Sequence, residues 1–193
     1  MEQRKGDWQE IYTGRFYAID PRSDEVSLLD IAHGLSQICR YTGQCKHFYS
    51  VAQHCLNVYK DLKQLGYDET IQLIGLLHDA SEVYISDLPK PFKVEIPEYK
   101  IFEEKIERAI YEKFGLPFPT DEIHKIIKFS DNEVLYNEVE SLMNNVENWT
   151  SKYPHRKLDI DTEFRDMREV EQEYLDTAKK LIKNNTSNQI EVV

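Results

Sequence analysis

Hydrophobic positions recur at helical spacing along most of the chain. Apolar residues stand three and four positions apart in the ranges 28–38 and 48–65, and Gly66 supplies a C-terminal stop for the second range. The range 71–83 is the most apolar stretch and is apolar on nearly every side, which predicts a buried core helix. Further helices are expected over 98–114, 120–146 and 162–183. The pattern predicts an all-α bundle of about six helices.

The segments around these helices follow other patterns. Aromatic and polar residues alternate around a Thr13-Gly14 turn, which indicates a short N-terminal β-hairpin. Ser27 or Asp30 can cap the first helix. Two prolines in the range 87–93 predict an extended loop, and the polar range 184–193 predicts a tail. We expect the range 1–193 to form a single domain.

Composition and charge narrow the possible partners. The 193 residues contain 24 Lys and Arg against 35 Asp and Glu, a formal charge of −11, which has the wrong sign for a broad nucleic-acid-binding face. A bound phosphate would have to be held locally, by a metal or a small basic pocket. The start of the chain is too polar for a signal peptide and no run reaches the roughly 20 apolar residues of a membrane span, so we expect a cytoplasmic protein without membrane partners.

The cysteines do not indicate a disulfide-stabilised fold or a zinc site. There are three of them, an odd number, and none forms a Cys-x-x-Cys pair. That count argues against a disulfide framework and against a thiolate zinc site, so the sequence predicts ordinary thiols.

The candidate chemistry is concentrated on the expected core helix. His78 and Asp79 interrupt its apolar pattern, and Glu82 follows one turn later on the same face. A buried carboxylate is costly unless it is paired or bound to a metal. On the preceding helix, His54 interrupts another apolar stripe. Both histidines lie 12 residues from Gly66, so an antiparallel helix pair would bring them together.

A third expected helix adds another carboxylate, Asp131, beside apolar neighbours. Two imidazoles and two carboxylates form a mixed nitrogen and oxygen shell suited to divalent transition metals, with positions left for water and substrate. The sequence has no Gly-x-Ser-x-Gly elbow or Cys/His pattern for a covalent nucleophile, and no Gly-rich phosphate loop.

The order of His54, His78-Asp79 and Asp131 resembles the His, His-Asp, Asp signature of the HD-domain metal-dependent phosphohydrolases. The segment 78–82, followed by Asp87-Leu88-Pro89-Lys90-Pro91, is similar to the branch that contains bacterial 5′-deoxynucleotidases and their phage-encoded relatives. Arg40-Tyr41-Thr42-Gly43 resembles the phage-type members in particular. The resemblance covers the range from about 30 to 142.

The resemblance implies a helical HD-domain bundle with one divalent ion, which could be Mn, Co, Fe, Ni, Zn or Mg. Its ligands would be His54, His78, Asp79 and Asp131. Glu82 and Asp87 match the family's catalytic carboxylates, which orient the attacking water and assist proton transfer. Arg40 matches the arginine that holds the substrate phosphate and sugar, and Lys93 matches a basic position after the catalytic aspartate.

Two positions depart from the family pattern. Tyr41 stands where the deoxynucleotidases carry a Trp that excludes a 2′-hydroxyl, so strict deoxyribose selectivity is not implied, although Tyr41 remains a candidate substrate contact. Ser86 stands where many members have Gly, which bears on the reach of the following loop.

The expected function is hydrolysis of the 5′-phosphate of deoxynucleoside monophosphates by attack of a metal-bound water. One alternative keeps the site and changes the substrate, as in a phage-type deoxynucleoside triphosphate triphosphohydrolase. Another is a non-catalytic metal- or nucleotide-binding module, in which Glu82 and Asp87 would have no task. The expected partner is a small-molecule nucleotide rather than nucleic acid, and the resemblance also implies a homodimer or higher homo-oligomer.

Overall fold

The computed structural model describes residues 4–146 and 152–190, which are mostly helical, as predicted. An antiparallel hairpin comes first, with Gln9 opposite Phe16. Its strands are β1 (Gln9–Ile11) and β2 (Gly14–Phe16). The α-helices are α1 (Leu28–Gln37), α2 (Val51–Gln64), α3 (Glu69–Leu76), α4 (Glu82–Ile85), α5 (Lys90–Lys93), α6 (Pro97–Lys113), α7 (Asp121–Leu142) and α9 (Met167–Ile190). Two 3-10 turns cover Ser23–Glu25 and Arg40–Gly43.

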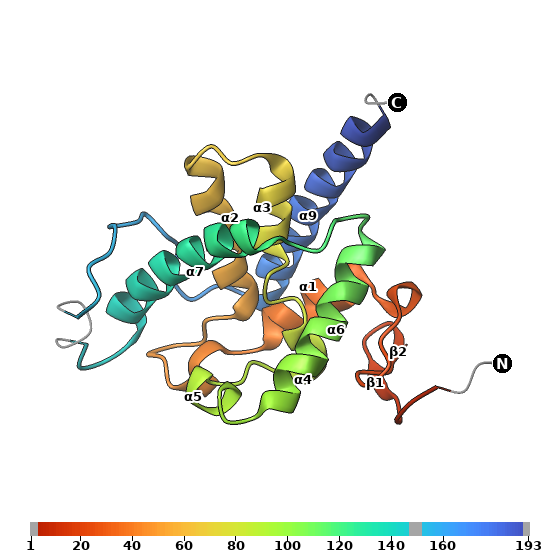
Figure 1. Cartoon of the computed structure of the whole chain (residues 1–193). Helices are drawn as coiled ribbons and strands as arrows, with labels where there is room; N and C mark the ends of the chain where they lie inside the picture. The colour runs from red at the N-terminus through yellow and green to blue at the C-terminus, as the bar shows by residue number, and fades with distance from the viewer. Residues whose placement is uncertain (1–3, 147–151, 191–193) are drawn as a thin grey trace.

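Helix α2 is the centre of the bundle. It packs against α1, α3, α7 and α9, and Figure 1 shows α7 crossing α2 and α3 with α9 running past them to the C-terminus. Ser50 and Gln53 form a capping box that satisfies the first amide groups of α2. Every residue from 51 to 58 is buried, including polar ones. Burying a polar side chain is costly unless it has a hydrogen-bonding partner or a bound ion, so the burial of His54 in this helix requires such a partner.

Helices α2 and α3 form the antiparallel pair that the equal spacing predicts. Gly66, at φ +79°, lets the chain turn directly after α2, and the Tyr67 amide donates to the Leu62 carbonyl. Gly75 allows α3 to approach α2 closely, because a Cβ atom there would lie 2.1 Å from Leu62 Cδ1. The pairing places the imidazole rings of His54 and His78 with their centroids 5.2 Å apart.

The expected single core helix over 71–83 is wrong in its C-terminal half. Helix α3 ends at Leu76, a turn follows, and the short α4 begins only at Glu82. The His78 ring is hydrogen-bonded through Nδ1 to the Gly75 carbonyl at 2.8 Å, the carbonyl that a continuing helix would need for the Asp79 amide. His78 and Asp79 therefore lie in a turn and not on a helix face.

Two other segments differ from their predictions. The range 87–93 contains a helical turn, α5, because a proline fits the first turn of a helix, where its missing amide is not needed. Helix α9 continues to Ile190, so the predicted tail is wrong for 184–190, and the range 191–193 lies outside the described residues. Asn184 and Asn185 hold this helix to the first turn of α3 through Glu69 and Thr70.

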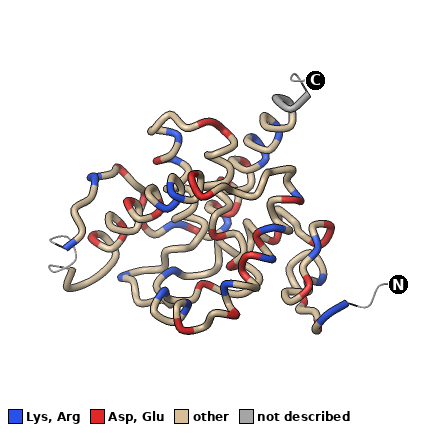
Figure 2. The backbone as a smooth tube through the Cα atoms, in the orientation of Figure 1, with Lys and Arg blue, Asp and Glu red and all other residues tan. Residues whose placement is uncertain are grey.

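The N-terminal hairpin is confirmed and is tied to α1. Ser27 caps α1 by accepting from the Leu29 amide, while Asp30 is buried and accepts from both the amide and the hydroxyl of Thr13. Lys, Arg, Asp and Glu alternate along the backbone of the described part instead of separating onto different elements (Figure 2). Within 4–146 and 152–190, no helix combines the length and apolar character needed to cross a bilayer.

We predict that Gly75→Ala destabilises the protein. The added methyl would overlap Leu62 in a packed core, which costs about 1–3 kcal/mol, and the better helix propensity of Ala returns up to about 1 kcal/mol. Urea unfolding should therefore show a loss of about 1–2 kcal/mol. Because Leu62→Ala frees the space, the double variant should lose less than the sum of the single variants. If the losses of the two single variants simply add in the double variant, the Leu62 side chain does not limit how closely α3 approaches α2.

Candidate metal centre and catalytic cavity

The imidazoles of His54 and His78 form the centre of the candidate site. His54 comes from the second turn of α2, and His78 comes from the turn after α3. Each Nδ1 atom has a hydrogen-bonding partner at 2.8 Å, which is Glu138 Oε1 for His54 and the Gly75 carbonyl for His78. Neither Nε2 atom has a hydrogen-bond partner among the described residues, although both are buried. An acceptor on Nδ1 favours the tautomer whose Nε2 lone pair is free for a metal ion.

Two carboxylates face these nitrogen atoms. Asp79 Oδ2 lies 3.3 Å from His78 Nε2 and 3.8 Å from His54 Nε2. Asp131 Oδ1, from α7, lies 3.1 Å from His54 Nε2 and 3.9 Å from His78 Nε2. Atoms that share an ion at about 2.1 Å are separated by about 3 Å or slightly more. His54, His78 and Asp131 offer ligand atoms that all lie within 4.8 Å of one another, a spacing that fits one divalent ion, and Asp79 approaches both imidazoles.

The charges of the four groups are strongly linked. Burial disfavours a charged His78 ring, but Asp79 outweighs burial, so the pKa of His78 lies well above its usual value. Burial also acts against the Asp131 carboxylate, yet the close approach of His54 and the attraction between the two groups keep the pKa of Asp131 well below the usual value. Protons therefore compete with a metal ion for the imidazole nitrogens, and metal binding releases protons.

A thiol lies against this cluster. Cys55 Sγ is within 4.8 Å of ligand atoms of His78 and Asp79, and its side chain is fully buried. Burial raises the pKa of Cys55 to about 11, so it stays a neutral thiol at physiological pH, whereas the thiolate is the metal-ligating form. Cys39 and Cys45 are also free thiols, in line with the prediction from their number.

Glu138 is a residue of the site that the sequence did not reveal. It is completely buried, on α7 two turns after Asp131, and its carboxylate accepts hydrogen bonds from the hydroxyls of Tyr41 and Tyr49 and from His54 Nδ1. Attraction to His54 and Arg40 overcomes burial and lowers the pKa of Glu138. Its only signal in the sequence is the seven-residue step from Asp131, which places both acids on one helix face.

Arg40 and Tyr41 lie in the 3-10 turn before α2. Arg40 is 8% exposed, with Nη1 3.5 Å from Asp79 Oδ2 and Nε 3.3 Å from Glu138 Oε2. Tyr41 has a φ of +57°, in the left-handed region, and its hydroxyl is fixed by Glu138. Glu138 therefore holds both the His54 ring and the turn that carries Arg40.

The remaining predicted residues lie on the other side of the cluster. Glu82 is 3% exposed and bonds Lys93 Nζ through Oε1 at 3.0 Å, while its Oε2 has no partner among the described residues. Lys93 bonds Glu103 at the same distance. Asp87 follows Ser86, whose φ of +70° and ψ of 155° belong to a region favoured almost only by Gly. Glycine adopts these angles without strain, which explains why the family pattern has Gly at the position of Ser86.

These groups border one cavity of about 710 Å³. Its walls include predicted ligands and predicted substrate-contacting residues from the 3-10 turn, the turn after α3, α5 and α7. The predicted residues on its lining are Arg40, Tyr41, His78, Asp79, Asp87, Lys93 and Asp131. Further lining residues that the sequence analysis did not select are Glu103, Glu107, Tyr111 and Lys128. The catalytic and substrate-binding roles of these residues stay predictions. The residues predicted for those roles either line this cavity or, like Glu82, contact a residue that lines it.

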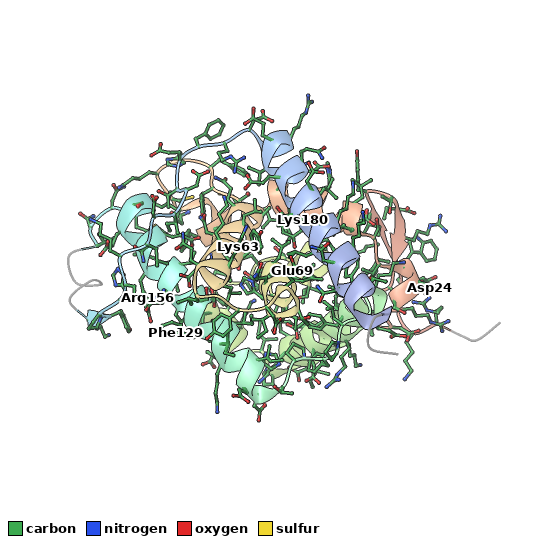
Figure 3. The ribbon with its side chains drawn as sticks, turned by 90° about the horizontal axis from the view of Figure 1, so that it is seen from above. Asp24, Lys63, Glu69, Phe129, Arg156 and Lys180 are labelled. Carbon is green, nitrogen blue, oxygen red and sulfur yellow. The ribbon has the colours of Figure 1, made fainter. Side chains whose placement is uncertain are left out.

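We predict that Glu138→Gln weakens metal binding. Loss of the carboxylate that orients His54 should reduce the affinity for Mn²⁺ or Co²⁺ by about 10- to 100-fold in calorimetric titration. The matched control is Glu133→Gln on the same helix, because Glu133 is also buried but pairs with Arg156, away from the cavity beside Phe129 (Figure 3). Equal losses in both variants would contradict a specific role for Glu138.

Comparison with known proteins supports the motif. Residues 51–145 match the HD domain family, a range that includes His54, His78, Asp79 and Asp131. The chain is 41% identical over 107 residues to the uncharacterized protein YfdR of Escherichia coli K12, covering 55% of this chain and 57% of that protein. It is 35% identical over 116 residues to the uncharacterized protein RCAP_rcc00048 of Rhodobacter capsulatus, covering 57% and 59%.

The matches thus span less than two thirds of either relative. Over residues 51–145 this protein is similar to the HD domain family.

Proposed function

We propose that this protein is a metal-dependent phosphohydrolase that removes the 5′-phosphate from deoxynucleoside monophosphates. The observation that carries the proposal is the pair of unpartnered, buried Nε2 atoms of His54 and His78, which face two carboxylates at the edge of a cavity large enough for a nucleotide. The HD domain match and the resemblance of the surrounding motifs to 5′-deoxynucleotidases support the same reaction.

The four ligand residues would hold one divalent ion. When bound, such an ion polarises a phosphoryl oxygen and lowers the pKa of a coordinated water. Arg40 supplies a permanent positive charge on the cavity wall, since the pKa of a guanidinium paired with Glu138 and Asp79 stays high even when buried. It can hold the substrate phosphate in place and balance the charge that builds up on its oxygens.

Glu82 is the group best placed to take a proton. Burial, with Asp79 and Asp87 nearby, raises the pKa of Glu82 well above its usual value, while Lys93 acts in the opposite direction. A carboxylate with a raised pKa is a stronger base than a solvated one and can accept a proton from water near neutral pH. Its Oε2, which has no partner among the described residues, is the atom that can receive that proton.

A second candidate substrate is a deoxynucleoside triphosphate. Lys90, Lys93 and Lys128 all line the cavity, and together they could balance a longer phosphate chain. Lys93 and Lys128 are already paired with carboxylates, so a triphosphate would have to displace those partners. The shorter monophosphate needs no such rearrangement, which is why we favour it.

Phosphorus NMR of the products separates these candidates. The protein would be incubated with Mn²⁺ or Co²⁺ and a panel of ribo- and deoxynucleoside mono- and triphosphates. We expect orthophosphate from the deoxynucleoside monophosphates. Intact tripolyphosphate from a triphosphate would establish the second candidate, and metal binding without any product would support a non-catalytic module.

We predict that Glu82→Gln retains the metal and loses turnover. The amide keeps the shape of the side chain but cannot accept the proton, so kcat should fall by about 10²- to 10⁴-fold. Metal content, measured by elemental analysis, should stay unchanged. Glu103→Gln is the matched control because it removes the other carboxylate partner of Lys93 and leaves Glu82 in place. Equal activity of the two variants would remove Glu82 from the mechanism.

A further inference from the structure

Glu107 is a carboxyl group of the cavity that the reaction does not use. It lies on α6, is partly buried, and lines the same cavity as His78, Asp79 and Asp131. One turn further along α6, Tyr111 also lines the cavity and is only 5% exposed. The carboxyl therefore stands in the wall of the cavity beside an aromatic ring.

The neighbouring acids of α6 have cationic partners, whereas Glu107 has none in the described part of the chain. Glu103 bonds Lys93 at 3.0 Å, and Glu104 pairs with Arg108 at 2.7 Å. No ion pair or hydrogen bond joins the Glu107 carboxyl to another described side chain. A partly buried carboxyl without a partner is costly unless a ligand supplies one.

The wall near Glu107 is suited to a flat heterocycle. Apolar side chains from α3 and α7 contribute to the cavity together with Tyr111, and they are Ile74, Ile127 and Leu135. Binding sites for small molecules combine such apolar walls with a few polar groups that fix orientation and specificity. Arg40 and the candidate metal ligands would hold the phosphate, and Glu107 is a carboxyl of the cavity wall that neither the proposed reaction nor an ion pair uses.

We propose that Glu107 is the specificity-determining residue that hydrogen-bonds the Watson–Crick edge of the nucleobase. This inference rests on the proposed nucleotide substrate and adds the means by which the site selects the base. A protonated carboxyl offers one donor and one acceptor, which match the ring nitrogen and amino group of adenine or cytosine. An ionised carboxylate offers two acceptors, which match the ring N–H and amino group of guanine.

Both forms of Glu107 are accessible near neutral pH. Burial, followed by the charges of Glu103 and Asp79, raises the pKa of Glu107 to about 7, and His78 acts in the opposite direction. Glu104 on α6 does not line the cavity and adds a smaller contribution that also raises the pKa of Glu107. The other charged or titratable groups on the cavity lining are Arg40, Tyr41, Asp87, Lys90, Lys93, Tyr111, His124, Lys128 and Asp131. A group with a pKa of about 7 changes from about nine-tenths protonated at pH 6 to about one-tenth protonated at pH 8.

The test measures binding of unphosphorylated deoxyadenosine and deoxyguanosine to the metal-free protein at pH 6 and pH 8 by calorimetry, because the charges of Asp79 and His78 that act on Glu107 are those of the cluster without an ion. These nucleosides carry no phosphate, so the readout does not depend on turnover, and neither base titrates in this range. Raising the pH should weaken deoxyadenosine binding and strengthen deoxyguanosine binding, each by up to about tenfold. Hydrolysis of the matching monophosphates, measured in parallel, should shift in the same directions.

The variant Glu107→Gln permanently presents one donor and one acceptor. We expect it to prefer deoxyadenosine at both pH values and to lose the pH dependence, while Glu112→Gln, at an exposed position of the same helix, behaves as the unmodified protein. Unchanged base preference in Glu107→Gln, with nucleotides still hydrolysed, would overturn this inference alone. Failure to bind or hydrolyse any nucleoside or nucleotide would overturn the proposed function as well.

Discussion

The architecture depends on two neighbouring imidazole rings, inclined to each other by 56°, whose Nδ1 atoms are already hydrogen-bonded. His54 and His78 lie 5.2 Å apart, and each directs an unpartnered Nε2 atom towards Asp79 and Asp131. Such an arrangement is unfavourable in a core unless something binds there, since buried polar atoms otherwise find partners. The close approach of α2 and α3, the end of α3 at Leu76, and the position of α7 all serve to hold this geometry.

A single buried carboxylate couples the candidate metal ligands to Arg40. Glu138 fixes His54 and, through Tyr41 and Arg40, also fixes the turn between α1 and α2. The turn contains left-handed residues, so it would not keep its shape without such support. A shift of Glu138 would therefore move a candidate ligand and the arginine together, whereas either could otherwise move independently. The structure in this way holds the distance between the His54 ring and the guanidinium of Arg40.

The sequence predicted the proximity of the two histidines better than it predicted the helices that carry them. Equal spacing from Gly66 was enough to bring His54 and His78 together, because the register of a helical hairpin is set by its turn. The break after Leu76 escaped prediction since apolar residues continue at helical spacing to Val83, and the interaction that ends the helix is a side-chain bond to its own backbone. Glu138 was missed for a different reason: an acid on an amphipathic helix is normally solvated, and only the tertiary contacts bury it.

The charge balance of the cavity differs from that of the whole protein. Five acids line the cavity, Asp79, Asp87, Glu103, Glu107 and Asp131, against four cations, Arg40, Lys90, Lys93 and Lys128. The lining is thus close to neutral, although the whole chain carries a formal charge of −11. A divalent ion held by the candidate ligands would make the cavity positive, and a proton on Glu107 would add to that effect. Because these charges are partly buried, salt screens them less than the charges of the acidic exterior, so the proposed attraction for a phosphate would be confined to the cavity.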